Sequence, residues 1–336
     1  MAALATGIGS MPGEDVRESV RIMLGEVGDL AFVPELPQRG VHADMTGRTL
    51  ALVADIGIDL QPAGWRLTDS SGVDHRRAVS LLAQDLDVLE ELAPARLDHL
   101  KLQVAGPWTL AATVERPRGD RVLADHGARR ELAQAAAEGV ARHVSDVRRR
   151  FSGAGTVIVQ VDEPALPAVL AGRVPTASGF GRHRSVAAPE AAAALGWFVE
   201  AVRQAGALPV VHCCADDVPL GVLREVDVHA LSLDISTATP ATYDDLAAWV
   251  EAGRQLWPGV VPAVEPKAAP AGAELTRRLL AWWADLGWAA VETVPEHVVT
   301  PVCGLAGASP GWARTALELA AVVARNVSVE QGKIEP

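Results

Sequence analysis

The sequence has few basic residues, and this shortage limits the partners that the protein could have. Among its 336 residues, 30 are Lys or Arg and 42 are Asp or Glu, which gives a formal net charge of −12 at pH 7. Proteins that bind nucleic acids present a basic face to the phosphates. An acidic chain whose only lysines are Lys101, Lys267 and Lys333 is therefore not expected to bind nucleic acid.

Long uninterrupted apolar segments are also missing. A membrane-spanning helix needs about 18 or more consecutive apolar residues, whereas the apolar-rich stretch at 187–202 contains both Glu and Pro. The first residues lack the basic segment that opens a secretory signal peptide. Hydrophobic residues nevertheless make up 49% of the chain, enough for a large folded core. The composition predicts a folded, cytoplasmic protein without contact to membranes.

Cysteine is scarce, with only Cys213, Cys214 and Cys303 present. The first two are adjacent, so their Cα atoms lie about 3.8 Å apart, closer than an ordinary disulfide accepts. Three cysteines in a cytoplasmic chain point to metal binding or catalysis rather than to structural disulfides.

Short apolar runs alternate with long Ala-, Leu- and Arg-rich helical segments along the whole chain. The runs are rich in Val, Ile and Leu, as in parallel strands that are buried on both faces. The expected strands are Leu4–Ile8, Leu30–Glu35, Leu100–Val104, Thr156–Asp162, Pro209–Cys213, Ala230–Asp234, Val260–Glu265 and Val298–Cys303. The expected helices are Glu14–Val27, Arg76–Leu92, Ala128–Phe151, Pro189–Ala205, Thr242–Leu256, Leu275–Leu286 and Gly311–Asn326.

Eight strands alternating with helices predict an α/β fold of the (β/α)8 TIM-barrel type. A doubly wound sheet is the competing arrangement, but the only Rossmann-like glycine run, residues 7–13, has Pro12 where the third glycine should stand. No low-complexity linker divides the chain, so a single domain over residues 1–336 is expected.

Polar and reactive side chains follow the predicted strands at their carboxyl ends, where the active sites of TIM barrels are built. Solvent contact alone would explain Ser10 or Glu163, and Glu163 could simply bond loop backbone. It does not readily explain a histidine, two cysteines and several acids on separate strands of one sheet.

The strongest local signal is the pair His212 and Cys214. Residues two apart on a strand face the same side, so these two side chains point together and Cys213 points away into the packing. Imidazole and thiolate suit Zn²⁺. Cys303 and the carboxylate of Asp234 would complete four ligands from three strands.

At this point the residues resemble a family, the catalytic C-terminal barrel of cobalamin-independent methionine synthase. The resemblance follows five motifs in order along most of the chain. They are Ile8-Gly9-Ser10-Met11-Pro12, Gly106-Pro107-Trp108-Thr109, Gln160-Val161-Asp162-Glu163-Pro164-Ala165-Leu166, His212-Cys213-Cys214 and Pro301-Val302-Cys303-Gly304-Leu305.

The resemblance implies a zinc-dependent transfer of a methyl group to the thiol of homocysteine, which forms methionine. His212, Cys214 and Cys303 match zinc ligands of the family, and Asp234 stands where the family has a ligating Glu. Ser10 matches a residue that holds the carboxylate of homocysteine. Asp162 matches one that holds its amino group, and Glu35 is expected to be a second carboxylate near that amine.

The half of the site that would hold the methyl donor departs from the family pattern. Glu265 stands in place of a histidine that is proposed as the proton donor, and is the expected catalytic acid. Thr113 stands where the family has a tryptophan that stacks on the pterin, and Trp108 lies elsewhere in that loop. These departures favour a methyl-corrinoid, free or carried by a corrinoid protein, over methyltetrahydrofolate as the donor.

Two other functions fit the same residues. One is a related zinc-dependent thiol alkyltransferase with a different thiol acceptor. The other is a non-catalytic homologue that binds zinc or an amino acid. Because one fold serves many chemistries, the fold does not choose among them.

Overall fold

The computed structural model describes residues 3–53 and 55–332. Its strands are β1 (Leu4–Ala5), β2 (Leu30–Phe32), β3 (Gly57–Gln61), β4 (Gly64–Thr68), β5 (Leu97–Ala105), β6 (Ala154–Asp162), β7 (Leu208–Cys213), β8 (Ala230–Asp234), β9 (Gln255–Val261) and β10 (Val298–Pro301). Its α-helices are α1 (Val16–Val27), α2 (Met45–Leu50), α3 (Val73–Leu92), α4 (Pro107–Thr113), α5 (His126–Arg150), α6 (Leu166–Leu170), α7 (Ala188–Gln204), α8 (Leu220–Arg224), α9 (Pro240–Glu251), α10 (Gly272–Asp285) and α11 (Pro310–Glu330).

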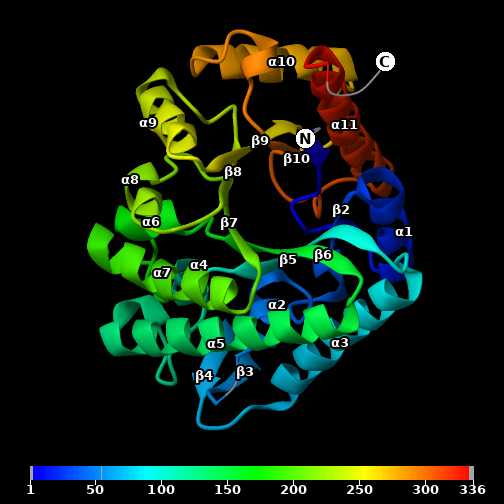
Figure 1. The fold of residues 1–336 in the computed structure, drawn as a ribbon. Helices are drawn as coiled ribbons and strands as arrows, with labels where there is room; N and C mark the ends of the chain where they lie inside the picture. Colours follow the sequence, from blue (N-terminus) through cyan, green and yellow to red (C-terminus); the bar gives the residue numbers. More distant parts are fainter. Residues whose placement is uncertain (1–2, 54, 333–336) are drawn as a thin grey trace.

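Eight parallel strands form one sheet in the order β1-β10-β9-β8-β7-β6-β5-β2. Its two edges meet just beyond β1 and β2, where Ser10 and Glu35 form a parallel bridge. The backbone N–H of Met11 donates to the Glu35 carbonyl at 2.8 Å, and that of Glu35 donates to the Gly9 carbonyl at 3.0 Å. The sheet therefore closes into the predicted (β/α)8 TIM barrel, with α1, α3, α5, α7, α9, α10 and α11 around the strands (Figure 1).

The barrel has two apolar cores. The larger lies between the strands and the surrounding helices and includes Trp249 and Trp283, both almost fully buried. A second, separate cluster lies inside the ring, because side chains from six different strands contact one another there. It consists of Leu30, Ile158, Val210, Ala230, Trp257 and Val298. This apolar plug lies near the amino ends of the strands and leaves the carboxyl end for polar residues.

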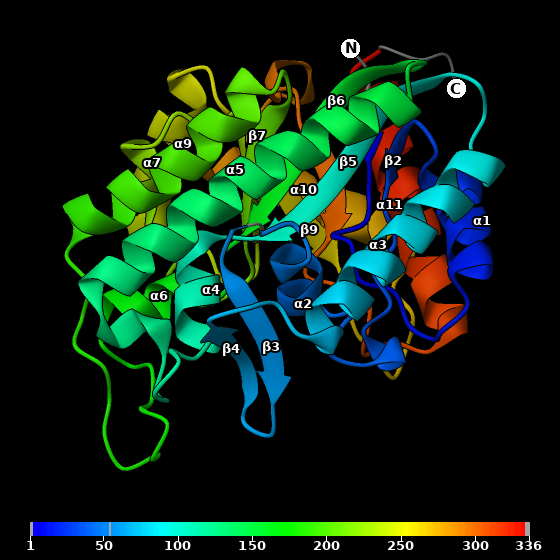
Figure 2. The ribbon, with the colours of Figure 1, turned by 90° about the horizontal axis from the view of Figure 1, so that it is seen from below.

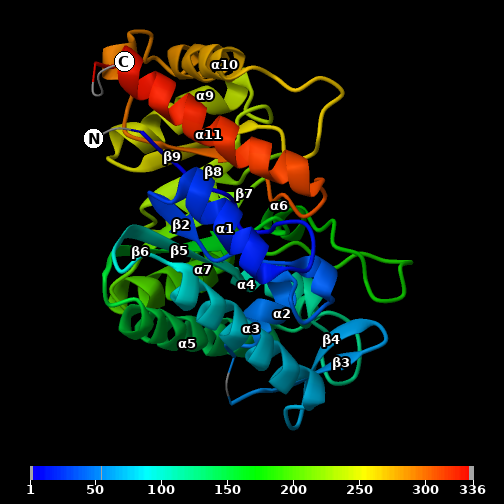
Figure 3. The ribbon, with the colours of Figure 1, turned by 90° about the vertical axis from the view of Figure 1, so that its right-hand side faces the viewer.

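The carboxyl end of the barrel carries the additions to the basic fold. The short helices α2, α4 and α6 lie there, because each follows a strand after a few residues or a loop. The antiparallel hairpin β3–β4 and the loop between α6 and α7 project from this end, as Figures 2 and 3 show from two directions.

The expected strands all correspond to strands of the barrel, although most of their ends differ by a few residues and the boundary before β9 was wrong. The segment predicted as the end of helix Thr242–Leu256 and as strand Val260–Glu265 instead forms the end of α9 and strand β9, Gln255–Val261. Gly253 explains the shift: its φ of 80° ends the helix, and its N–H donates to the Val250 carbonyl at 2.8 Å. The hairpin β3–β4 was not predicted.

No helix within the described residues has the length and apolar character needed to cross a membrane.

Candidate active site

One cavity of about 310 Å³ opens at the carboxyl end of the barrel and contains six of the eight predicted site residues. These are Ser10, Glu35, Asp162, His212, Cys214 and Cys303. They come from the ends of five strands, which the closed ring holds around a common centre. The sequence prediction that strand ends converge on one site is therefore met for these six side chains.

Three of them form a compact cluster of soft donors. The ligand atoms of His212, Cys214 and Cys303 all lie within 4.8 Å of one another. His212 lies near the end of β7, Cys214 follows that strand, and Cys303 follows β10. Both cysteines are free and half-buried, whereas the neighbouring Cys213 is buried, as the strand alternation predicts.

The two nitrogens of His212 have different surroundings. Nδ1 lies 3.0 Å from the hydroxyl of Ser232, which is in register with it on β8. Nε2 is buried and has no hydrogen-bond partner among the described residues. An imidazole with one nitrogen held by a hydrogen bond and the other without a partner has the arrangement that a metal ligand needs.

The thiols influence one another's ionisation. The pKa of Cys303 is lowered to about 4, because the Cys214 thiol donates a hydrogen bond to it and His212 lies beside it. The same contact raises the pKa of Cys214. Since metals bind the thiolate, Cys303 is prepared for coordination, and two sulfurs with one imidazole fit Zn²⁺.

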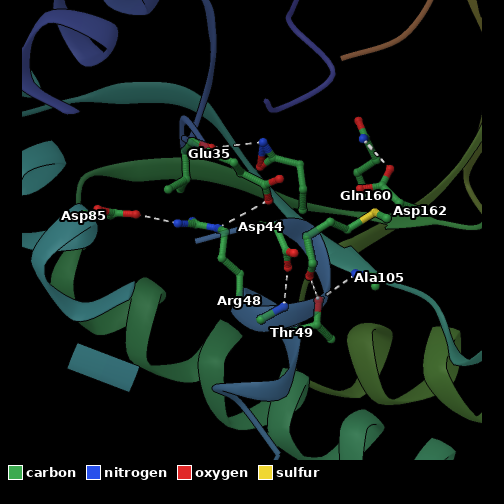
Figure 4. A network of polar contacts seen from close by, with 12 residues as sticks. Glu35, Asp44, Arg48, Thr49, Asp85, Ala105, Gln160 and Asp162 are labelled. Atoms are coloured by element: carbon green, nitrogen blue, oxygen red, sulfur yellow. Dashed lines mark hydrogen bonds and ion pairs between the residues drawn. The ribbon is translucent and has the colours of Figure 1, made fainter. Parts of the chain in front are cut away.

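Two buried carboxylates stand beside this cluster. Asp162 is 6% exposed and pairs in register with His212, while Glu35 is 5% exposed. Burial raises the pKa of Glu35 to about 7, and the guanidinium of Arg48, 3.4 Å away, opposes this shift. Burial also raises the pKa of Asp162 to about 6, against the nearby His212 and the amide of Gln160. Figure 4 shows both carboxylates and their partners.

Ser10 completes the cavity wall through a close fit with the loop that carries Cys303. A Cβ on Gly304 would lie 2.1 Å from the Ser10 hydroxyl, so only glycine allows this approach. The N–H of Leu305 donates to the Ser10 carbonyl at 2.8 Å. The first and last sequence motifs are therefore in direct contact.

Asp234 and Glu265 do not line this cavity. Asp234 ends β8, but its Oδ1 accepts from the N–H of Ser236 at 2.8 Å, and among the described residues the metal-capable cluster contains only the histidine and the two cysteines. Glu265 is exposed on the loop after β9 and accepts a hydrogen bond of 2.8 Å from Ser309. The structure thus gathers the expected thiol half of the site and leaves the expected acid outside it.

The predicted donor half shows a further difference. Trp108 is 1% exposed, and its indole N–H donates to the Ala191 carbonyl on α7 at 2.9 Å. Thr113 bonds back to the Thr109 carbonyl at 2.7 Å within α4. Neither residue lines the cavity.

Sequence reasoning missed several residues in and behind the cavity. Asp44 and Met45, at the start of α2, line it, and nothing in the periodicity of that segment predicts so short a helix. Lys101 and Gln160 lie directly behind it. A signal existed for both: Lys101 is a lysine within an apolar strand, and Gln160 shares a strand face with Asp162.

The protein is a closed (β/α)8 barrel with thiol and imidazole groups and buried carboxylates at its carboxyl end, where the active sites of TIM-barrel enzymes lie. The family described as "Cobalamin-independent synthase, Catalytic domain" matches residues 97–326. The chain belongs to this family, which confirms the resemblance noted in its motifs and indicates a methionine synthase-like enzyme.

One solved structure has the same fold. A B12-independent methionine synthase from Shewanella sp. W3-18-1, in complex with selenomethionine, is similar with a TM-score of 0.60 and 13% identity, over 99% of this chain and 100% of that chain. A 2,3-dimethylmalate lyase of the PEP mutase/isocitrate lyase superfamily has a TM-score of 0.39 and 12% identity, over 94% of this chain and 80% of that chain. No curated protein matches the sequence.

The family assignment changes one expectation. Its members are described as cobalamin-independent. This description gives no support to the methyl-corrinoid donor, or to the corrinoid-protein partner, that the departures in the sequence favoured, and that expectation is withdrawn.

Proposed function

We propose that this protein is a zinc-dependent methyltransferase that moves a methyl group to the thiol of homocysteine and so forms methionine. One observation carries the proposal: a single cavity places a cluster of two thiols and an imidazole beside two buried carboxylates. Homocysteine has the matching groups, a thiol for a soft metal and an ammonium for carboxylates. In this proposal the chain acts as one catalytic barrel.

His212, Cys214 and Cys303 would hold the zinc. Three protein ligands leave a fourth position free, as catalytic zinc sites require. When bound, Zn²⁺ lowers the pKa of a thiol that it coordinates, so that the acceptor sulfur is nucleophilic at neutral pH. Asp234 would join these ligands only if it released the Ser236 N–H that it now accepts.

The other residues of the cavity would position the amino acid. Asp162 and Glu35 would accept hydrogen bonds from its ammonium, and the Ser10 hydroxyl would donate one to its carboxylate. With both ends held, the sulfur would face the methyl donor in a fixed direction, which reduces the entropy cost of the transfer.

In the transfer itself, the sulfur forms a bond to the methyl carbon while the bond between that carbon and the donor breaks. With the corrinoid set aside, methyltetrahydrofolate remains as the expected donor, and its departing nitrogen must take up a proton. The exposed carboxyl of Glu265 would have to move toward the cavity to supply it, because it does not line the cavity in this structure.

Methionine formation from homocysteine and methyltetrahydrofolate by the zinc-loaded protein tests the proposal. The expected result is turnover that Asp162→Asn reduces strongly while the zinc content stays constant, with Asp244→Asn, a change on the outer helix α9, as the matched control. Calorimetric titration with homocysteine should show binding weakened by about 1.5–3 kcal/mol in Asp162→Asn. If the protein turns over another thiol but not homocysteine, it is the alternative thiol alkyltransferase.

A further inference from the structure

The lysine inside the barrel, Lys101 on β5, is fully buried. Its ammonium donates to the Ile8 carbonyl at 2.8 Å and to the side-chain oxygen of Gln160 at 2.6 Å, and lies 5.6 Å from the centre of the Phe32 ring. Among the described residues, Asp162 and Glu35 are the carboxylates that attract its charge. Lysine is rarely buried so completely, because desolvating its charge is costly. A role beyond packing is therefore expected.

Gln160 on β6 connects this ammonium to the cavity. It is fully buried, and its Nε2 donates to Asp162 Oδ1 at 2.7 Å and to the Ile8 carbonyl at 2.8 Å. Figure 4 shows the contact between Gln160 and Asp162. The chain of contacts runs from Lys101 through the amide to the carboxylate.

The donors and acceptors around Gln160 fix which end of its amide faces Asp162. The Ile8 carbonyl can only accept, so the NH₂ group of the Gln160 amide faces it and the amide oxygen faces the Nζ donor of Lys101. The NH₂ group must then face Asp162, where it occupies one carboxylate oxygen. Without Lys101 the buried amide oxygen would have no donor, and the amide would lose one of the contacts that hold it against Asp162.

We propose that Lys101, acting through Gln160, is a positioning residue that holds one oxygen of Asp162 and presents the other to the ammonium of the substrate. The inference rests on the proposed function, since it concerns how that site selects an amino acid among thiols. Lys101 itself does not line the cavity, and besides these contacts its charge acts on Asp162 and Glu35 from inside the barrel.

Two ligands that differ only in the amino group separate this role from a general structural one. Homocysteine and 4-sulfanylbutanoate share the thiol and the carboxylate, and only homocysteine has the ammonium. We define the selectivity as the ratio of the two affinities, measured by calorimetry on the zinc-loaded protein. Lys101→Met should reduce this selectivity by about 10-fold or more through weaker homocysteine binding, with the affinity for 4-sulfanylbutanoate and the zinc content unchanged.

Gln160→Met keeps the lysine but removes the link, and should lower the selectivity by a similar factor; it also tests the proposal if Lys101→Met does not fold. In an Asp162→Asn background, Lys101→Met should cause no further loss of selectivity, because the group it orients is already changed. Thr6→Val is the matched control: it removes a buried hydrogen bond, from the Thr6 hydroxyl to the Leu30 carbonyl, that is not connected to Asp162.

Unchanged selectivity in both Lys101→Met and Gln160→Met would overturn the proposal, as would an equal loss of affinity for both ligands. If the unaltered protein does not prefer homocysteine at all, the proposed function fails, and the inference with it. If it does prefer homocysteine and the variants retain that preference, only the inference fails.

Discussion

The proposed metal site depends on how a single imidazole is held. His212 Nδ1 shares a hydrogen bond with the hydroxyl of Ser232, and the buried Nε2 lies on the other side of the ring without a partner among the described residues. Such a second residue fixes both the tautomer and the orientation of a histidine ligand. Ser232 is fully buried and precedes Asp234 by two positions on the same face of β8.

Replacement of Ser232 should therefore weaken zinc binding. Ser232→Ala removes the hydrogen-bond partner of Nδ1, and the expected loss of zinc affinity is roughly 10–100-fold. Competition with a chromophoric zinc chelator measures it. Ser236→Ala, an exposed hydroxyl just beyond the same strand, should retain the original affinity; equal affinity in all three proteins would show that Ser232 does not orient the ligand.

The binding of an amino acid should depend on pH through Glu35. Burial raises the pKa of this carboxyl to about 7, so it is ionised above that pH and neutral below it. Only the ionised form attracts an ammonium strongly. Methionine affinity should therefore fall as the pH is lowered from 8 to 6.5. Methionine is the useful ligand because its thioether carries no proton that would add to the effect.

Titration calorimetry of methionine at several pH values checks this dependence. Glu35→Gln should bind methionine more weakly at pH 8 and show a flatter profile over the same range. Glu265→Gln changes an exposed carboxyl outside the cavity and should keep the original profile. An unchanged slope in Glu35→Gln would mean that another group governs the dependence.

At the scale of elements, the motif that follows β6 holds the motif at the start of α4 in place. Glu163, after β6, is fully buried and accepts from the N–H groups of Trp108 and Thr109 at 2.9 Å each and from the Thr109 hydroxyl at 2.8 Å. A Cβ on Gly106 would lie 2.3 Å from this carboxylate, so the motif needs glycine there. Glu163 thus bonds loop backbone and holds the start of α4 beside Asp162.

Glu163→Gln should destabilise the fold by about 1–3 kcal/mol. Both oxygens of the carboxylate accept from donors, so the NH₂ group of the glutamine would face a donor and lose that hydrogen bond. Urea unfolding measures the change as a lower midpoint at constant slope. Glu318→Gln, an exposed change on α11, should stay within about 0.5 kcal/mol of the original protein. Equal stability of the two variants would show that the buried carboxylate is not required to hold α4.

The alternation of apolar strands and long helices was enough to predict all eight barrel strands, because strands buried on both faces have a distinctive composition. It failed where a local signal was ambiguous. Gln255 and Leu256, the first residues of β9, were assigned to the end of a helix, although Gly253 ends α9 before them. Short helices such as α2 have too few residues to show a period, so Asp44 and Met45 at its start were missed.

At the scale of the whole molecule, the barrel interior is divided into two zones. The apolar plug fills the amino end, and Lys101, Gln160 and Asp162 lead from it toward the cavity. Strand-end residues such as His212 and Cys303 could be predicted to converge, because parallel strands end at one edge. The direction in which a side chain turns after its strand ends could not be predicted from the sequence. Asp234 and Glu265 therefore lie outside the cavity to which the sequence assigned them.

The central claim is that His212, Cys214 and Cys303 hold one zinc ion to which the sulfur of homocysteine binds. X-ray absorption at the zinc edge tests it most directly, since it counts sulfur neighbours at about 2.3 Å. The account predicts about one zinc per chain with two sulfur neighbours, and three after homocysteine is added. Cys303→Ser should lower the zinc affinity or leave one protein sulfur. Zinc surrounded only by nitrogen and oxygen, or an unchanged sulfur count at saturating homocysteine, would contradict the account.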